Sequence, residues 1–449
     1  MQILVLNGSP KGENSVTLQT VRYLEKRFPE ESFDVLHVGQ HIKSLEKDFS
    51  KAAEALEKAE LLLFCYPVYT FLVPSQLHRF VELVKAHGLD LSGKKAAQIT
   101  TSLHFYDVTA HRFIRDNCDD LDLAYLGGLS ADMEDLLKPQ GRKEAEDFFR
   151  FVLWRSERGL SEPKQNKTVA FSPVPLREAC TPAEKKPGRI AVVADFDPAA
   201  ESPIRAMIER FSAVSPYETT VVNLFEFPFA GGCLGCFRCA ADGACVYRDG
   251  FDSFLRERIQ TADAIVYAFA IKDHSMGYRM KLFDDRQFCN GHRTVTMGKP
   301  VGYLIDGALS QEENLRTVIE SRAEVGGNFL AGVATNERDP DAAIEALSET
   351  LDYALEHAYQ PPKTFWGVGG MKIFRDLIYT MRGLMKEDHR FYKKHGFYDF
   401  PQKRKGRILG MYLVGGMMRS KKLQKKLSGK MTEGMLMPYK KALEQAEKE

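Results

Sequence analysis

The sequence predicts an α/β protein with two doubly wound domains in tandem, each built on a five-stranded parallel sheet, followed by a basic helical extension. Short apolar runs with the spacing of buried strands alternate with helical segments, and this alternation occurs twice along the chain. The length of 449 residues exceeds what one hydrophobic core usually supports. With 44% hydrophobic and 27% charged residues, the composition excludes a disordered or fibrous protein.

The first domain is predicted over residues 1–157. Its strands are expected at residues 2–7, 33–38, 61–67, 96–101 and 123–127. Helices are expected from residue 14, between the second and third strands, from residue 74, near 108–117 and over 142–157. Strands that alternate with helices in this way form parallel sheets with helices on both faces.

A connector over residues 158–188, rich in Pro, Lys, Glu, Ser and Gln and without periodicity, separates the two domains. The second domain, residues 189–358, repeats the pattern. Its strands are expected at residues 190–194, 220–224, 264–270, 301–305 and 329–334, and its helices at 204–211 and 340–357. Two similar units in one chain indicate a tandem duplication, which predicts a pseudo-dimer within one chain and leaves a further homodimer open.

The extension, residues 359–449, carries 21 Lys and Arg against 8 Asp and Glu, a charge of +13. The whole chain has a net charge of +1, so residues 1–358 form an acidic body with a charge of −12. Aromatic, Met and Gly residues lie between the charges of the extension, so we expect it to pack against this acidic body or a second chain, and we expect no nucleic-acid partner. A membrane surface is the less favoured partner, suggested by the apolar residues 408–418 and the basic run after them. No segment is long enough to span a bilayer and the N-terminus lacks a secretory signal, which predicts a cytoplasmic protein.

A polar loop from Asn7 to Ser15 joins the first strand to the first helix. Backbone N–H groups at a helix N-terminus attract anions. Gly8 permits a tight turn, Ser9 and Ser15 offer hydroxyls, and Lys11 supplies positive charge, while Asn14 is expected to cap the helix. The loop predicts a phosphate monoester site, and the alternative is an ordinary capped strand-to-helix turn.

Two more loops are expected at the same edge of the sheet, because the carboxyl ends of parallel strands meet there. The third strand continues into Pro67-Val68-Tyr69, and the fourth ends in Thr101-Ser102. In an open sheet of this kind, ligands bind in the crevice between such loops. We therefore expect a single pocket in which backbone amides and aromatic side chains flank a flavin ring.

These motifs resemble the NAD(P)H-dependent FMN reductases of the flavodoxin-like fold. The likeness covers residues 1–150 and, more loosely, 188–358. It implies an FMN-phosphate site and a site for the flavin ring. The phosphate site would comprise Ser9, Lys11, Asn14, Ser15 and Thr17, and the ring site would comprise Pro67, Val68, Tyr69, Thr101 and Ser102. Lys11 stands where Arg is commoner, which replaces a bidentate fork with a point charge.

Four of the eight cysteines gather in one segment: Cys233, Cys236, Cys239 and Cys245. Such compact spacing suits a [4Fe-4S] cluster better than structural zinc. The segment also resembles the iron-sulfur flavoproteins, which implies these four cysteines as cluster ligands. Free or redox-active thiols are the alternative. His104 and His274 are further pocket candidates by their positions in loops.

The second domain has Asp195-Phe196-Asp197-Pro198 where a phosphate loop would lie. Two carboxylates repel a phosphate, so we expect this domain to have lost flavin binding. The resemblance then implies an FMN-dependent oxidoreductase. It would pass electrons from NAD(P)H or another donor through FMN to a small acceptor, a redox protein or an iron-sulfur cluster. The alternative is a non-catalytic flavin-binding electron carrier or interaction module.

Overall fold

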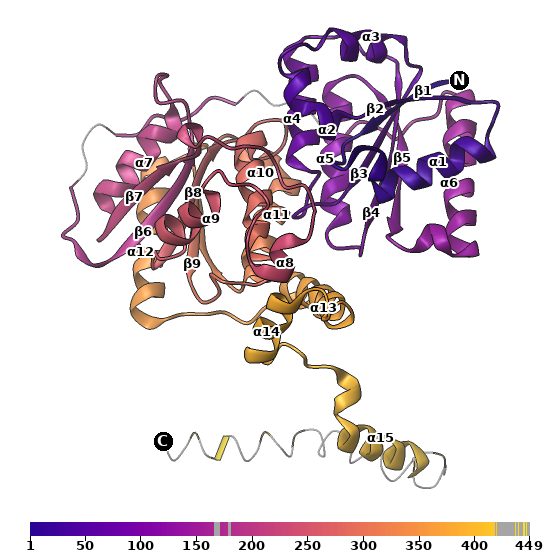
Figure 1. Cartoon of the computed structure of the whole chain (residues 1–449). Coiled ribbons are helices and arrows are strands. Elements are labelled where there is room, and N and C mark those ends of the chain that lie inside the picture. The colour runs from indigo at the N-terminus through magenta and orange to yellow at the C-terminus, as the bar shows by residue number, and fades with distance from the viewer. Residues whose placement is uncertain are drawn as a thin grey trace. The chain divides into compact units, whose positions relative to one another are not determined.

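The computed structural model describes residues 1–165, 171–177 and 181–417, and residues 419, 436, 439, 443, 444 and 446 (Figure 1). The strands of the first half are β1 (Gln2–Asn7), β2 (Ser32–Leu36), β3 (Leu61–Pro67), β4 (Lys95–Ser102) and β5 (Ala124–Asp132). Its helices are α1 (Val16–Arg27), α2 (Val38–Leu45), α3 (Ser50–Lys58), α4 (Ser75–Ala86), α5 (Asp107–Asp120) and α6 (Pro139–Glu157).

The second half repeats this alternation. Its strands are β6 (Lys186–Asp195), β7 (Tyr217–Asn223), β8 (Ala264–Ala270), β9 (Pro300–Asp306) and β10 (Phe329–Thr335). Its helices are α7 (Pro203–Val214), α8 (Arg238–Asp242), α9 (Phe251–Phe254), α10 (Gly277–Arg286), α11 (Glu313–Gly326) and α12 (Pro340–His357). They are followed by α13 (Phe365–Thr380), α14 (Lys386–Lys394) and α15 (Lys405–Met417).

Both sheets have five parallel strands in the same order. The first is β2-β1-β3-β4-β5, and the second is β10-β9-β8-β6-β7, which is the same arrangement when its strands are counted from β6. This is the flavodoxin-like order, with the ligand crevice between the first and third strands of the sheet. The predicted fold class is therefore confirmed, together with a helical C-terminal region.

Three predicted strands, β1, β3 and β8, have the expected bounds. Two others differ for local reasons. The second strand ends at Leu36, because Val38 already begins helix α2. The fifth was expected to stop at Gly127, yet β5 continues through Gly128 to Asp132 and pairs with β4 beyond a shift in register.

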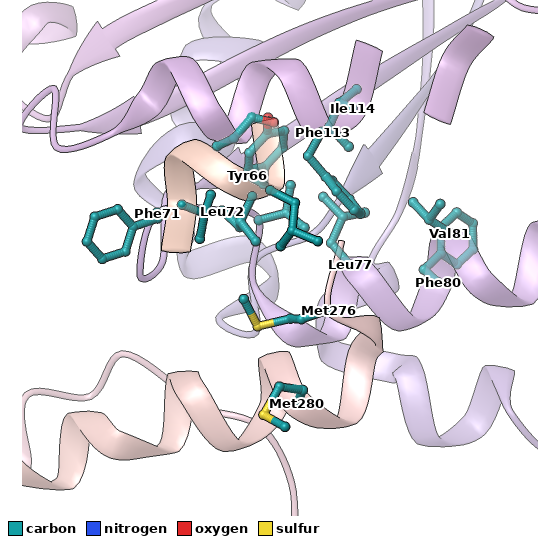
Figure 2. Packing of buried hydrophobic residues seen from close by; sticks show 14 of the residues in the cluster. Tyr66, Phe71, Leu72, Leu77, Phe80, Val81, Phe113, Ile114, Met276 and Met280 are labelled. Carbon is teal, nitrogen blue, oxygen red and sulfur yellow. The ribbon is translucent and has the colours of Figure 1, made fainter. Parts of the chain in front are cut away.

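The cores show which helices cover which face of each sheet. Helices α1 and α6 bury apolar side chains against one face of the first sheet, and α7 and α12 do so in the second half. The largest cluster is continuous between the halves, because α4 and α5 of the first pack near α10 and α11 of the second. Figure 2 shows Met276 and Met280 of the second half beside Leu72 and Leu77 of the first.

Helices α4 and α10 also cap each other. The backbone N–H of Ser75, which begins α4, donates to Asp285 Oδ2 of α10 at 2.7 Å. The backbone N–H of Tyr278, in the first turn of α10, donates to Glu82 Oε1 of α4 at 2.8 Å. A carboxylate at a helix N-terminus satisfies an orphan donor and matches the helix dipole. Each helix therefore supplies the carboxylate that caps the other. Such reciprocal contacts are typical of a two-fold symmetric interface, and here they form within one chain.

The chain divides into two compact units, Met1–Phe391 and Tyr392–Glu449. Helix α13 belongs to the first unit, where Thr364 and Gly367 bind the Glu324 carboxylate of α11 and the ring of Phe374 stacks on that of Phe105. The predicted domain bounds at residues 157, 188 and 358 stay predictions. Among the described residues, no helix is long and apolar enough to cross a bilayer.

His274 links the two halves through carboxylates and carries a pH prediction. Its Nε2 lies 3.0 Å from Asp120 Oδ2 of α5, and its Nδ1 lies 3.0 Å from Glu312 Oε1. Burial lowers the pKa of His274, but hydrogen bonds with these two carboxylates outweigh it and raise the pKa to about 10. The stabilisation is fully present below the unfolded-state pKa of about 6.5 and is lost as the pH rises through 10.

We therefore expect His274→Gln to lower the urea midpoint of unfolding strongly at pH 6 and less at each step toward pH 10. The matched control is His104→Gln, since the His104 side chain is 54% exposed beside Asp107 and its ion pair contributes little. Equal losses of midpoint for His274→Gln at pH 6 and pH 10 would contradict this assignment.

Candidate functional site

A cavity of about 310 Å³ lies at the carboxyl end of the first sheet and is lined by both halves. That volume is within the range of small-molecule sites. Nine of the ten sequence-predicted cofactor residues line it: Ser9, Lys11, Ser15, Thr17, Pro67, Val68, Tyr69, Thr101 and Ser102. The tenth, Asn14, is exposed and does not line it.

The loop after β1 is organised by its own hydrogen bonds. The Ser9 N–H donates to Asn7 Oδ1 at 3.2 Å, and the Lys11 N–H donates to Ser9 Oγ at 3.3 Å. Ser15 caps α1, since its hydroxyl accepts from the Leu18 N–H. The expectation that Asn14 caps this helix is wrong, because Asn14 ends the short 3-10 turn that precedes it.

The polar groups facing the cavity from the first half suit a phosphate ester. Ser9, Ser15 and Thr17 are at most 1% exposed, and Thr17 Oγ1 lies 2.6 Å from Thr101 Oγ1 of the neighbouring loop. Lys11 forms no salt bridge within the described residues, and its Nζ lies 5.7 Å from the centre of the Phe237 ring. Buried hydroxyls, a cation and the orphan N–H groups of a helix start form the donor set that an FMN phosphate requires.

The loop after β3 forms the adjoining wall. Val68 N–H donates to Thr101 O at 3.3 Å, which ties this loop to the end of β4. The Tyr69 side chain is half-buried, and this burial raises the pKa of its hydroxyl well above the usual value. Tyr69 is therefore a neutral phenol at physiological pH and can donate a hydrogen bond.

The cysteine segment of the second half forms the opposite wall. Cys233, Cys236, Cys239 and Cys245 all line the cavity. Burial raises the pKa of Cys233 far above its usual value and that of Cys239 to about 11, so both are thiols at neutral pH. Throughout the described ranges, no group of three or more His, Cys, Asp or Glu side chains is placed to hold a metal ion. As arranged here the four thiols do not fit a cluster, and the [4Fe-4S] assignment stays a prediction.

The cysteine segment packs closely on the first half. A methyl group at Gly232 would lie 2.6 Å from Ser75 Oγ, and one at Gly235, where φ is +60°, would overlap the Tyr69 hydroxyl. The carbonyl of Cys233 accepts from Gln76 Nε2 at 3.3 Å. A larger residue at either position would have to displace these side chains, so the two walls of the cavity are in direct contact.

Arg286, at the end of α10, anchors the same segment. Its guanidinium donates two hydrogen bonds to the Asp249 carboxylate, both at 2.8 Å, and a third to Gly231 O at 2.9 Å. Rings of Tyr247 and Phe251 lie 4.6 Å and 4.8 Å from it. The bidentate fork and the two ring faces fix the position of the guanidinium in this buried wall.

Several lining residues were missed by the sequence reasoning. They come from the segment after α10, from α13 and from the residue that follows α13, and comprise Phe288, Cys289, His292, Ile373, Phe374, Leu377 and Met381. The apolar spacing in α13 is a helical stripe that could have been noticed, whereas Cys289 stands alone in the sequence and gives no signal. Burial raises the pKa of Cys289 to about 12. His104 and His274 do not line the cavity.

At the equivalent crevice of the second half, the end of β6 carries an ion pair, and the loop that follows has no phosphate-loop motif. Asp195, which ends β6, is bound by Arg279 of α10 at 2.6 Å. The ring of Phe225 lies 4.5 Å from the same guanidinium. An ion pair thus stands where the first half presents its phosphate loop, and the loss of flavin binding in the second half stays a prediction.

The strand order defines the fold as flavodoxin-like, and the cavity lies at the edge of the sheet where proteins of this fold bind ligands. Residues 1–112 match the family model of the NADPH-dependent FMN reductases. An iron-sulfur flavoprotein from Archaeoglobus fulgidus is 28% identical over 175 residues, which cover 37% of this chain and 79% of that protein. The resemblance to these two groups is thereby confirmed.

Solved structures with a similar fold align with one part of the chain. An FMN-dependent NADH-azoreductase from Bacillus anthracis, solved with FMN, is 13% identical and covers 35% of this chain and 99% of its own, with a TM-score of 0.28. General stress protein 14 from Treponema denticola, also solved with FMN, is 16% identical and covers 35% of this chain and 99% of its own, with a TM-score of 0.28.

Proposed function

We propose that the protein is an FMN-dependent oxidoreductase, which binds one FMN in the first half and passes electrons from NAD(P)H to a small-molecule acceptor. The observation that carries the proposal is the convergence of three loops, after β1, β3 and β4, on one cavity. The family match over residues 1–112 supports the flavin. When bound, FMN would supply the chemistry by accepting a hydride and releasing electrons to the acceptor.

The residues of the chain bind and orient the cofactor. Lys11, with the hydroxyls of Ser9, Ser15 and Thr17, would hold the phosphate in a buried, cationic cradle. Pro67, Val68 and Tyr69 on one loop, and Thr101 and Ser102 on the next, would flank the ring. The family match covers residues 1–112 as a whole, and the roles of these individual side chains are part of our proposal.

The second half would close the site against water. Phe237, Phe288 and the apolar face of α13, including Phe374 and Leu377, line the cavity opposite the flavin loops. Exclusion of water strengthens the electrostatic interactions of a bound cofactor and protects a reduced one from side reactions. Burial keeps Cys233 and Cys239 of this wall protonated at neutral pH, because it raises the pKa of both thiols, and no step of the proposed reaction passes through the cysteines.

The test is the absorption spectrum, flavin content and iron content of protein purified without oxygen, followed by steady-state oxidation of NADH and NADPH. We expect flavin bands with one FMN per chain and turnover with a quinone or dye as acceptor. Absence of flavin after incubation with FMN would refute the proposal.

Two results of that experiment separate the alternatives. Flavin without turnover by either nicotinamide would favour the non-catalytic carrier. About four irons per chain, lost when any of Cys233, Cys236, Cys239 or Cys245 is changed to Ser, would establish the cluster in place of free thiols.

A further inference from the structure

The turn after β3, beside the proposed ring site, has an unfavourable backbone conformation. Tyr69 N–H donates to Leu72 O at 2.8 Å and Leu72 N–H donates to Tyr69 O at 3.0 Å, so two residues form its centre. These residues, Thr70 and Phe71, have φ of 41° and 70°. Asn and Gly adopt this conformation easily, whereas a β-branched and a bulky residue adopt it only when the surroundings hold it.

Two side chains of α10, in the second half, hold the turn. Lys281 Nζ donates to Tyr69 O at 2.9 Å. Asp285 accepts from Thr70 Oγ1 at 3.3 Å and from the Ser75 N–H at 2.7 Å. Lys281 and Asp285 also form an ion pair, and both are 0% exposed. The Lys281–Asp285 pair, called the dyad below, therefore contacts the first residue of the turn, a central residue and the first residue of α4.

The burial of this ion pair needs a reason other than stability. Removing two charges from water is costly, and neutral replacements for buried pairs are often equally stable. Such pairs can instead specify one geometry among several. In this chain the geometry that the dyad specifies is that of the turn whose first residue, Tyr69, lines the cavity.

The equivalent turn of the second half provides an internal comparison. There Asp273 and His274 have φ of 52° and 61°, and Glu82 caps α10 as Asp285 caps α4. The counterpart of Lys281 is His78, whose ring nitrogens have no hydrogen-bond partner among the described residues. A carboxylate thus caps the helix after the turn in both halves. In the described part of the chain, a charged side chain that donates to the first carbonyl of the turn, as Lys281 does, is found only at the turn of the first half among these two.

We propose that Lys281, paired with Asp285, is a positioning residue for the flavin: it holds the strained turn at Tyr69 so that the loop after β3 faces the ring. The inference rests on the proposed function and deepens it by making the second half part of the first half's site. Lys281 acts through Tyr69 and does not line the cavity itself.

The test variant is K281M/D285N, which removes both charges and keeps an oxygen for the Ser75 N–H. We expect the dissociation constant for FMN to rise about tenfold, as loss of one hydrogen bond from a charged donor implies. The visible circular dichroism and the reduction potential of bound FMN should shift, while the urea midpoint stays near that of the wild type. Adding T70N, which favours the turn by itself, should restore FMN affinity.

The matched control is K272M/E82Q, which removes the ion pair beside the equivalent turn of the second half and should leave all flavin properties unchanged. If K281M/D285N does not fold, K281M alone serves, because burial raises the pKa of Asp285 and favours its neutral form. Equal effects in test and control, or no rescue by T70N, would overturn the inference.

Hydrogen exchange separates this inference from the proposed function. In flavin-free protein, the Leu72 amide should exchange faster in K281M/D285N than in the wild type, because its bond to Tyr69 O depends on the held turn. A wild-type chain that binds no FMN would refute the proposed function while this readout still tests the turn. Unchanged exchange at Leu72 would refute the role of Lys281.

Discussion

A chain with Ser9→Ala and Lys11→Met should lose FMN. Both side chains line the cavity from the phosphate loop, and Lys11 forms no salt bridge within the described residues that would compete for its charge. Loss of one charged and one neutral donor to a phosphate should raise the dissociation constant on the order of 10²-fold. Fluorescence titration of flavin-free protein with FMN measures this directly.

The companion result concerns the second half. Asp195→Asn should leave both FMN affinity and a stoichiometry of one unchanged, because Asp195 pairs with Arg279 away from the described cavity. Two flavins per chain in the wild type, or equal loss in both variants, would show that the cofactor site has been assigned to the wrong crevice.

Asp249→Ala should destabilise the second half strongly. It removes the partner of Arg286, whose side chain is 1% exposed, and leaves a buried guanidinium without its carboxylate. Breaking a buried pair from one side costs about 3–5 kcal/mol. We expect a large fall in the urea midpoint at pH 7 and, because Arg286 anchors the cysteine segment, faster reaction of Cys233 with thiol reagents.

Two comparisons check this prediction. Burial raises the pKa of Asp249, but the Arg286 hydrogen bonds outweigh it and lower the pKa to about 2. The stabilisation is therefore present above about pH 4 and lost as the pH falls toward 2, where variant and wild type should converge. Glu209→Ala, in an exposed pair with Arg205, should change stability by less than about 1 kcal/mol. A similar small change for Asp249→Ala would contradict the anchoring role.

The fold could be predicted because its signals are local. β1 and β3 are short, largely apolar runs, and β1, β3 and β8 have the predicted bounds because a turn or a helix start follows them directly. β5 continues past Gly127 because its pairing with β4 tolerates a shift in register, and such pairing is not visible in one strand alone. The doubly wound, flavodoxin-like fold class followed from the α/β alternation and the family likeness.

Only the wall of the cavity that the first half forms could be predicted from the sequence. The loops after β1, β3 and β4 can be read from consecutive residues, and nine of their ten named residues line the cavity. Its other wall is assembled by tertiary contacts between α10, α13 and the cysteine segment. Cys289 could not be placed in this wall from sequence, and neither could the Lys281–Asp285 pair be placed behind the Tyr69 turn, because their partners lie in the other half or in distant segments.

Because α4 and α10 belong to one polypeptide, the two-fold contact between them forms at an effective concentration set by the chain and not by the solution. Dilution cannot separate the two halves, so their interface can tolerate a costly feature such as the buried Lys281–Asp285 pair. A substitution also occurs on one side only, whereas in a dimer of identical chains it occurs twice. His78 and Lys281 could therefore differ at equivalent positions, leaving one half free to serve the cofactor of the other.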